Sequence, residues 1–482
     1  MPPSTLPDIE PVPTLLARVR TELAADFPPA KPIRVSRAPG RLDVMGGIAD
    51  YTGSLVCQLP LDRAAAVALQ QRDDRQLQVF SFNLYDDHKP FTFRIPLEAM
   101  AKYPAEALRR EFAEPGRRWA AYLAGCLYML HDCGLVDLAD PKGMGMNLAV
   151  YSTVPPGCGV SSSAALEVAT MVNLVDHLGL RDRVTGMRVA ELCQAAENRI
   201  VGAPCGIMDQ ITSCLGEADS LLRMVCQPHE LLPPRRLPRG ICVVGIDSNV
   251  RHDVGGPAYA RTRCAAFMGH RIILEKMRQM GRSVGRELVD DPMRGYLANL
   301  DPDDYKRLFR SHVPALLRGY DFQRQYGTTI DPVTTIESGY KYAVQHATDH
   351  HVLEARRVRR FVEFLEQACD LDGPRRGSPL DRAGHLMYAS HQSYTMDAML
   401  GAPECDLLVE LVRQRESEGF YGARITGGGS GGTVAVLARN SDRAFAALDQ
   451  VMSEYSQRTR RIPQVFINSS PGAWQIGSAL VR

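Results

Sequence analysis

The chain has 482 residues, 45% of them hydrophobic and 23% charged, a composition typical of a globular protein too long for one ordinary core. Lys and Arg total 56 and Asp and Glu total 55, so the net charge of +1 gives no electrostatic reason to expect nucleic acid or an anionic membrane as a partner. The 12 cysteines form no Cys-x-x-Cys pair, and no apolar run is long enough to span a bilayer. We therefore expect a cytoplasmic protein with free thiols.

Strands and helices mix in the first half of the chain. A proline-rich segment at residues 1–32 surrounds one amphipathic stretch at 14–25. Short apolar runs separated by turn residues predict a mostly antiparallel sheet, with strands at 34–37, 55–59, 64–70, 76–82 and 146–154. Helices are predicted at 117–134, where apolar residues recur at helical spacing, from 161 onward and at about 188–201.

The second half is predicted to be largely helical. The proline-rich segment at 231–238 resembles a boundary between lobes. A strand is predicted at 241–246, another at 433–437 and a last helix from about 442. Because no regular βαβ rhythm is visible, we predict an α+β fold with two lobes, residues 1–235 and 236–482.

One glycine-rich turn carries the strongest chemical signal. The sequence Pro-Pro-Gly-Cys-Gly-Val-Ser-Ser-Ser-Ala at 155–164 follows a predicted strand and opens a predicted helix. Glycines let a backbone approach a ligand closely, and the first amides of a helix favour an anion. The segment predicts a phosphate cradle, although it is neither a Walker A loop nor a dinucleotide fingerprint. The alternative is an ordinary turn with a serine helix cap.

Two carboxylates lie in the next conspicuous segments. Glu197 is in Ala-Glu-Asn-Arg on a predicted helix, and Asp209 is in Cys-Gly-Ile-Met-Asp-Gln after a proline–glycine break. One carboxylate near a phosphate cradle can hold a metal ion, and a second can orient or deprotonate an attacking hydroxyl. The alternative is a pair of solvated surface acids.

Two further segments have weaker signals. The run Thr-Gly-Gly-Gly-Ser-Gly-Gly at 426–432 is flanked by strand-like residues, which favours a tight turn packed against another backbone over a flexible linker. The segment 38–51 places Arg41 and Asp50 among small residues. It is either the wall of a polar ligand site or an ordinary loop between strands.

Together these four segments resemble the GHMP kinases, and within them the galactokinase group, over residues 34–473. The resemblance implies a first lobe like ribosomal-protein S5 domain 2, a ferredoxin-like second lobe, an active site between them, and the use of ATP and Mg²⁺. It implies that Asp209 is the catalytic carboxylate with Arg41 beside it, and that Ser163 and Glu197 hold magnesium. The ATP site would comprise Gly157, Gly159, Ser161, Ser162, Ser163 and Trp119, and the sugar site would comprise Asp50, Gly47, Ile48, Asp209, Tyr259 and Gly428.

One departure from the family bears on the substrate. Galactokinases have Gly-Glu-His-Thr-Asp where this chain has Gly-Gly-Ile-Ala-Asp at 46–50. By the resemblance, the absent Glu would receive the 6-hydroxyl of galactose, which Gly47 and Ile48 cannot do with their side chains. L-Arabinose in its pyranose form lacks the sixth carbon, and the segment looks like that of plant-type L-arabinokinases. An insertion at about 276–345 also looks like that subgroup, and we expect an L-arabinose 1-kinase.

Four alternatives stay open from the sequence. The first is a galactokinase and the second is a kinase for another sugar. The third is a sugar- and ATP-binding regulator without turnover, against which the intact Arg41, Ser163, Glu197 and Asp209 argue. The fourth is a metal site at His346, His350 and His351, for which exposed histidines on a helix are the more common explanation. The sequence gives neither the oligomeric state nor the reactivity of Cys158 and Cys205.

Overall fold

The computed structural model describes residues 6–140, 143, 145–203, 205–251, 256–369 and 378–482. A first lobe is built on an eight-stranded sheet in the order β14-β1-β2-β5-β3-β4, with β6 paired to β2 and β7 paired to β6. Only the β3–β5 pair of this described sheet is parallel, so the predicted mostly antiparallel sheet is confirmed. Its strands are β1 (Ile33–Met45), β2 (Leu55–Gln71), β3 (Gln76–Ser81), β4 (Thr92–Pro96), β5 (Met146–Ser152), β6 (Ser220–Val225), β7 (Glu230–Arg236) and β14 (Ser478–Val481).

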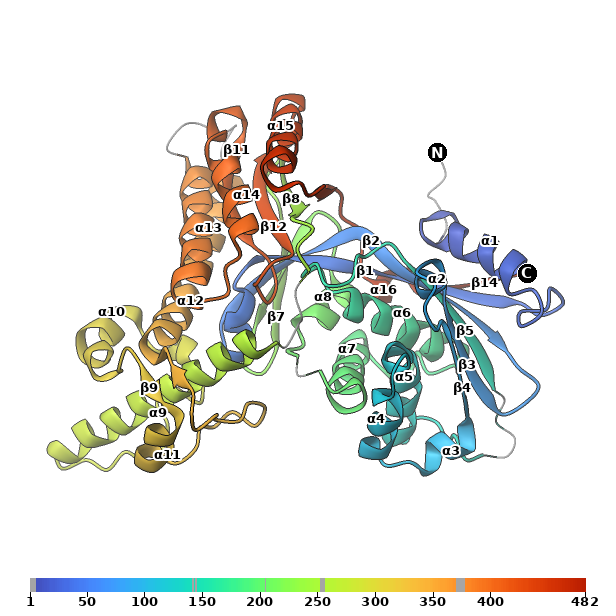
Figure 1. The fold of residues 1–482 in the computed structure, drawn as a ribbon, viewed down its shortest axis with the longest axis horizontal. Coiled ribbons are helices and arrows are strands. Elements are labelled where there is room, and N and C mark those ends of the chain that lie inside the picture. Colours follow the sequence, from blue (N-terminus) through green and yellow to red (C-terminus); the bar gives the residue numbers. More distant parts are fainter. Residues whose placement is uncertain (1–5, 141–142, 144, 204, 252–255, 370–377) are drawn as a thin grey trace.

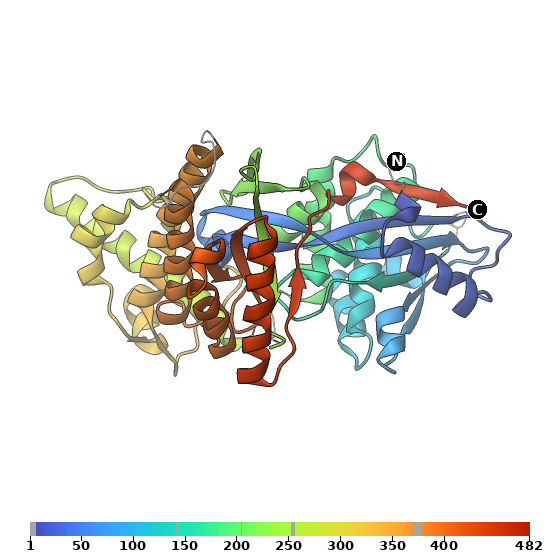
Figure 2. The same ribbon diagram turned by 90° about the horizontal axis from the view of Figure 1, so that it is seen from above.

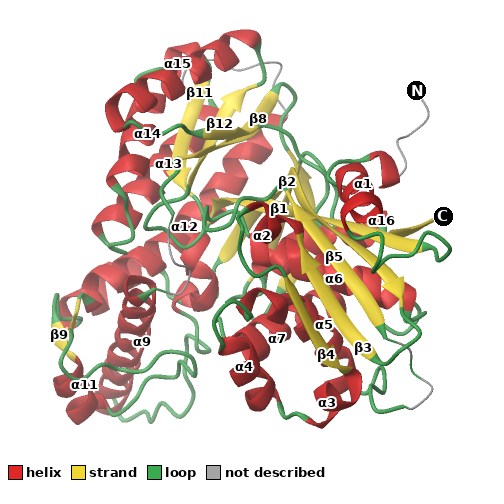
Figure 3. Cartoon of the chain, turned by 45° about the vertical axis from the view of Figure 1, so that its right-hand side comes forward, coloured by secondary structure: helices red, strands yellow, loops and turns green. Residues whose placement is uncertain are grey.

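Helices cover both faces of this sheet because alternate strand residues point in opposite directions. Val67 and Leu69 of β2 pack in one core cluster with α5 (Ala121–Asp132), α6 (Ser162–His177) and α7 (Gly186–Ala196), whereas Ala66 and Ala68 pack with α1 (Val12–Glu22) on the other face. Figure 3 shows α1 and these helices on opposite sides of the strands. The remaining helices of this lobe are α2 (Phe82–Asp86), α3 (Leu97–Lys102), α4 (Ala105–Ala113), α8 (Met208–Leu215) and α16 (Ala473–Ile476).

The second lobe has a four-stranded antiparallel sheet in the order β11-β12-β8-β13. Its strands are β8 (Ile241–Asp247), β11 (Phe420–Ile425), β12 (Thr433–Arg439) and β13 (Gln464–Phe466), and its helices are α12 (Val344–Cys369), α13 (Pro379–Met396), α14 (Pro403–Arg413) and α15 (Asp442–Thr459). Between β8 and α12 lie α9 (Pro257–Ser283), α10 (Pro302–Asp304), β9 (Leu317–Arg318), α11 (Gly319–Tyr326) and β10 (Lys341–Tyr342), which project away from the first lobe (Figure 1).

Three local predictions need correction. The strands predicted at 55–59 and 64–70 are one strand, β2, since the intervening Pro-Leu-Asp-Arg falls where the β1–β2 register shifts and bends the strand without ending it. The segment predicted as a lobe boundary at 231–238 forms most of β7, a strand at the edge of the sheet where prolines are tolerated. The helix predicted to reach residue 201 ends as α7 at Ala196 and continues as one π-helical turn, Glu197–Val201.

The end of the chain returns to the first lobe. Strand β14 pairs with the beginning of β1, so that Ser478 lies opposite Ser36. The division predicted at residues 235 and 236 assigned this segment to the second lobe, and Figure 2 shows it instead crossing back along the first sheet. A shared apolar cluster also joins the lobes, because Leu42 and Val160 pack with Val243, Phe361 and Leu437.

Candidate active site

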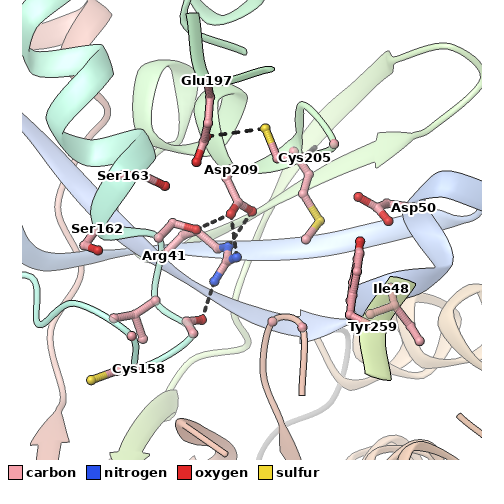
Figure 4. Close-up of a pocket in the computed structure, with 18 of the residues that line it drawn as sticks. Arg41, Ile48, Asp50, Cys158, Ser162, Ser163, Glu197, Cys205, Asp209 and Tyr259 are labelled. Carbon is pink, nitrogen blue, oxygen red and sulfur yellow. Dashed lines mark hydrogen bonds and ion pairs between the residues drawn. The ribbon is translucent and has the colours of Figure 1, made fainter. Parts of the chain in front are cut away.

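A pocket lies where the two lobes meet (Figure 4). The first lobe contributes β1, the segment after it, the turn after β5 and the N-terminal ends of α6 and α8, while the second contributes α9 and the glycine turn after β11. The lining residues are Arg41, Ile48, Asp50, Pro155, Gly157, Cys158, Gly159, Val160, Ser161, Ser162, Ser163, Glu197, Cys205, Gly206, Met208, Asp209, Tyr259, Gly427 and Gly428. The structure therefore brings together all four segments that the sequence singled out.

The turn after β5 has the geometry of an anion cradle. Gly157 and Gly159 have φ values of 71° and 73°, in the left-handed region that favours glycine. Ser161 is also left-handed at φ 58°, and α6 begins at the next residue. The first amides of a helix have no acceptor within it and carry the positive end of its dipole. In this 16-residue helix they border the pocket, where Ser162 and Ser163 also lie.

The glycine turn between β11 and β12 packs against this cradle. A Cβ atom added to Gly432 would lie 2.5 Å from the carbonyl oxygen of Cys158, and one added to Gly427 would lie 2.9 Å from that of Gly159. Both glycines also have positive φ values, 82° and 70°. The run at 426–432 is therefore a tight turn against another backbone, as predicted, and the linker alternative is wrong.

Arg41 and Asp209 form a bidentate ion pair at the centre of the pocket. Arg41 Nε donates to Asp209 Oδ1 at 2.8 Å and Nη2 donates to Oδ2 at 2.7 Å, while Nη1 donates to the Gly159 carbonyl at 2.6 Å. The hydroxyl of Ser161 also donates to Asp209 Oδ2. Arg41 is buried, whereas the Asp209 side chain is 24% exposed and faces the pocket. The carboxylate is thus held in one orientation and stays accessible to a ligand.

A second carboxylate, Glu197, lies buried beside Asp209. Burial, together with the charge of Asp209, raises its pKa to about 6 against the opposing effect of hydrogen bonds from Ser163, Cys205 and Gln210. The Gln210 amide donates to Glu197 Oε2 at 2.7 Å. Two neighbouring carboxylates and the Ser163 hydroxyl around one pocket are oxygen donors of the kind that Mg²⁺ prefers, and a cation would offset the unfavourable burial of the Glu197 charge. The residues present therefore fit a divalent cation.

The other end of the pocket is formed by Asp50, Ile48, Tyr259 and Gly428. Asp50 lies in a 3-10 turn, Gly47–Thr52, and accepts the Tyr51 backbone N–H at 2.6 Å. Burial raises the pKa of Asp50 to about 7. Ile48 is 2% exposed, so this end combines one titratable carboxyl, one phenol and an apolar side chain.

Two of the predicted site residues do not line the pocket. Gly47 is buried behind Ile48, and a Cβ atom added to it would lie 1.8 Å from the Tyr394 hydroxyl oxygen. That hydroxyl accepts the Ile48 N–H at 2.8 Å and donates to the Gly427 carbonyl at 3.0 Å. Trp119 lies in a 3-10 turn, Arg118–Ala120, and packs partly buried against the core of the first lobe.

Several supporting residues were missed by sequence reasoning because they come from distant segments without a local motif. Tyr394 is on α13, and His351 on α12 contacts the Tyr51 hydroxyl with Nε2 at 2.9 Å and the Thr52 hydroxyl with Nδ1 at 3.1 Å. His350 is also buried and contacts the Ser393 hydroxyl. The expectation of exposed helix histidines is therefore wrong for both, and no cluster of three or more His, Cys, Asp or Glu suited to a metal occurs in the described part of the chain.

The two cysteines of the pocket are held as thiols. Burial raises the pKa of Cys158 to about 12, and the Asp247 carboxylate, whose Oδ2 lies 3.2 Å from the sulfur, adds to the shift. Burial likewise raises the pKa of Cys205 well above its usual value, with Glu197 contributing. Because the thiolate is the reactive form, neither environment favours nucleophilic cysteine chemistry.

Comparison with known proteins decides the family. The model of the GHMP kinases N terminal domain matches residues 121–217, and that of the GHMP kinases C terminal domain matches residues 376–457. L-Arabinokinase of Arabidopsis thaliana is 36% identical over 93% of this chain, which spans only 47% of that relative. Galactokinase of Chloroflexus aggregans is 30% identical over 90% of this chain and 91% of its own length. The chain belongs to the GHMP kinase family.

The fold agrees with that membership. The structure of Lactococcus lactis galactokinase complexed with galactose matches with a TM-score of 0.70 at 21% identity, covering 96% of this chain and 99% of that one. The predicted two-lobed α+β GHMP kinase fold is thus confirmed. As a GHMP kinase related to L-arabinokinase and galactokinases, the chain is a phosphotransferase with an alcohol acceptor. Within the described residues, none of the helices combines the length and apolar character needed to cross a bilayer.

Proposed function

We propose that this GHMP kinase transfers the γ-phosphate of ATP to the anomeric hydroxyl of L-arabinose, giving the sugar 1-phosphate and ADP. The observation that carries the choice of sugar is the filled space at Gly47. A glycine there could in principle enlarge the pocket, but the Tyr394 hydroxyl occupies the place of a side chain, 1.8 Å from the Cβ position. The wall at this position is therefore the apolar Ile48, and the carboxyl at this end of the pocket, Asp50, is assigned below to the ring hydroxyls and not to a 6-hydroxyl.

The phosphate cradle indicates where the phosphate donor, ATP, would bind. The amides at the start of α6 and the turn containing Gly157 and Gly159 would bind the ATP phosphates. Ser163 and Glu197 would hold magnesium, which when bound compensates negative charge on the phosphates. Both groups lie next to the ion pair of Arg41 and Asp209, so donor binding and acceptor activation share one pocket.

Asp209 would accept the proton of the sugar's anomeric hydroxyl. As the anomeric oxygen forms its bond to the γ-phosphorus, the bond between that phosphorus and the bridging oxygen of ADP breaks, and the hydroxyl proton passes to Asp209. Arg41 and Ser161 fix the carboxylate through three hydrogen bonds while it remains exposed to the pocket. Asp50 and Tyr259 would bind ring hydroxyls at the far end.

Galactose is the second candidate acceptor. The observation in its favour is the 30% identity to Chloroflexus aggregans galactokinase over nearly the whole of both chains. A galactose molecule in this pocket would place its 6-hydroxyl against an apolar wall, and an unpaired hydroxyl costs about 1–3 kcal/mol. We therefore expect galactose to be the poorer substrate.

The reaction is tested by phosphorus NMR of the product formed from ATP, magnesium and L-arabinose. A sugar phosphate whose phosphorus couples to the anomeric proton supports the proposal. A phosphate ester at any other carbon, or ADP formed without a sugar phosphate, would refute the assignment of a 1-kinase.

A further inference from the structure

The insertion at 276–345 returns to the edge of the active site. Its loop at 331–337 folds back against the first turns of α9, the helix that carries Tyr259. Together they enclose a small hollow that shares Tyr259 with the main pocket and is otherwise lined by residues such as Arg263, Thr334 and Tyr342. Figure 1 shows the insertion extending away from the first lobe, and through Tyr259 this loop borders the main pocket.

Asp331 of that loop forms a buried ion pair with Arg263 of α9. Its side chain is fully buried and accepts hydrogen bonds from Arg263 Nε at 3.0 Å and Nη2 at 2.8 Å. The loop itself holds the carboxylate, since Thr334 donates its hydroxyl at 2.5 Å and its N–H at 3.2 Å. Burial opposes ionisation, but the bonds from Arg263 and Thr334 keep the pKa of Asp331 below its usual value. The pair is therefore ionic and fixed from both sides.

Arg263 passes this constraint to the acceptor end of the pocket. Its guanidinium carbon lies 4.9 Å from the centre of the Tyr51 ring, within the range of a cation–π contact. Tyr51 in turn meets Tyr259 edge to face, with ring centres 6.0 Å apart at 84°. The backbone N–H of Tyr51 also binds Asp50. One connected series of contacts thus runs from Asp331 through Arg263 and Tyr51 to the two polar residues of the acceptor end.

We propose that Asp331 is a positioning residue for the sugar acceptor, and that the insertion supports the acceptor wall from behind. The inference rests on the proposed function insofar as the acceptor is a sugar bound by Asp50 and Tyr259. The cradle and the pair of Arg41 and Asp209 make no contact in this series, so the effect is confined to acceptor binding.

The test compares Asp331→Asn with Glu337→Gln. Glu337 lies in the same loop and also binds an arginine of α9 through two hydrogen bonds, at 2.9 and 3.0 Å, but its partner Arg261 lies over the exposed Tyr340 ring. We expect Asp331→Asn to raise KM for L-arabinose about tenfold, with KM for ATP and kcat changed less than about twofold. Glu337→Gln should leave all three unchanged. Equal effects in both variants, or a larger effect on ATP, would overturn the inference.

A second variant guards against loss of folding. In Arg263→Gln with Asp331→Asn the buried ion pair is replaced by two neutral amides that can bond to each other, and the new asparagine keeps an oxygen for Thr334, while the cation over Tyr51 is lost. This folded double variant should show the same rise in KM for the sugar. A wild-type KM in it would show that the pair serves stability alone.

Hydrogen exchange separates this inference from the proposed function. In Asp331→Asn without any sugar, amides at 47–52 and 257–263 should exchange about tenfold faster than in Glu337→Gln, because the wall has lost its support. If the wild-type chain phosphorylates neither sugar, the proposed function fails and this exchange still decides the role of the insertion. Unchanged exchange in both segments would refute it.

Discussion

At the scale of single residues, the reaction depends on how Asp209 is held. Its two carboxylate oxygens are bound by Arg41, and Ser161 adds a third hydrogen bond, yet a quarter of the side chain stays open to the pocket. Fixed orientation removes the need to order the base at the moment of reaction. The pair also joins β1 to α8, residues 168 positions apart in the sequence.

Asp209→Asn tests this role. Asparagine keeps the size of the side chain and an oxygen for Arg41, but it cannot accept the proton at neutral pH. We expect kcat to fall about 10²–10⁴-fold, the usual contribution of general base catalysis, while KM for ATP changes little. The measurement is ADP release at saturating substrates, with Asp87→Asn, at an exposed ion pair, as the control. Turnover within tenfold of wild type would assign the proton to another group.

Asp50 predicts a pH dependence of acceptor use. Burial raises its pKa to about 7, so its protonated form dominates below that pH and its carboxylate above it. A carboxylate accepts hydrogen bonds from sugar hydroxyls better than the acid does, so kcat/KM for the sugar should rise from pH 6 to pH 8. Because the folded pKa is raised, the stability that Asp50 contributes at low pH is lost as pH rises through about 7. An unchanged inflection in Asp50→Asn would contradict this.

Residues with a chemical role were predictable from sequence where they lie in a short motif. Arg41, Asp50 and Glu197 directly follow a glycine or an alanine, Asp209 lies three residues after Gly206, and all four line the pocket. Their supports were not predictable. His351 lies 300 positions from its partner Tyr51, and Tyr394 lies 346 positions from Ile48. Asp331 lies 68 positions from Arg263. The local sequence around these supporting residues contains no recognisable motif.

At the scale of elements, the glycine turn after β11 packs against the phosphate cradle and sets its position. Its backbone fits against the backbone of residues 158 and 159 without room for a methyl group at Gly432 or Gly427. The sequence predicted such a turn because strand-like residues flank the glycines. It did not predict which backbone the turn would contact, since that depends on how the two lobes meet.

Gly432→Ala should therefore act on ATP. The new methyl group would meet the Cys158 carbonyl at 2.5 Å and displace the cradle, raising KM for ATP about tenfold with a smaller effect on KM for the sugar. Gly240→Ala is the matched control, since Gly240 has a similar φ of 74° but no atom within 4 Å of the added Cβ. It carries the same backbone strain without the clash. If both variants raise KM for ATP equally, strain and not contact is responsible.

At the scale of the whole molecule, two features close the lobes on each other. Strand β14 returns the end of the chain to β1, and Arg424 of β11 binds Asp43 of β1 at 2.9 Å, with both side chains fully buried. The fold class was predictable from the order of strands and helices. The β14 pairing was not, because it joins residues more than 440 positions apart and a four-residue strand has no signal of its own.

Arg424→Met tests the contribution of that ion pair. It leaves the buried Asp43 without its cation, and breaking a buried pair from one side costs about 3–5 kcal/mol of unfolding free energy. Urea-induced unfolding measures the loss. Arg458→Met, at a half-exposed pair with Glu454, should change stability by less than about 1 kcal/mol. Equal losses of unfolding free energy in the two variants would mean that the buried pair between the lobes stabilises the fold no more than an exposed pair does.

The central claim, an L-arabinose kinase, is tested most directly by ADP release with ATP and magnesium, comparing kcat/KM for L-arabinose and D-galactose. With Ile48 at the wall and Tyr394 filling the space at Gly47, we predict a preference for L-arabinose of about 10- to 100-fold, the value of one unpaired hydroxyl. Equal or better use of D-galactose would contradict the account, since the 6-hydroxyl would then have a partner in this pocket.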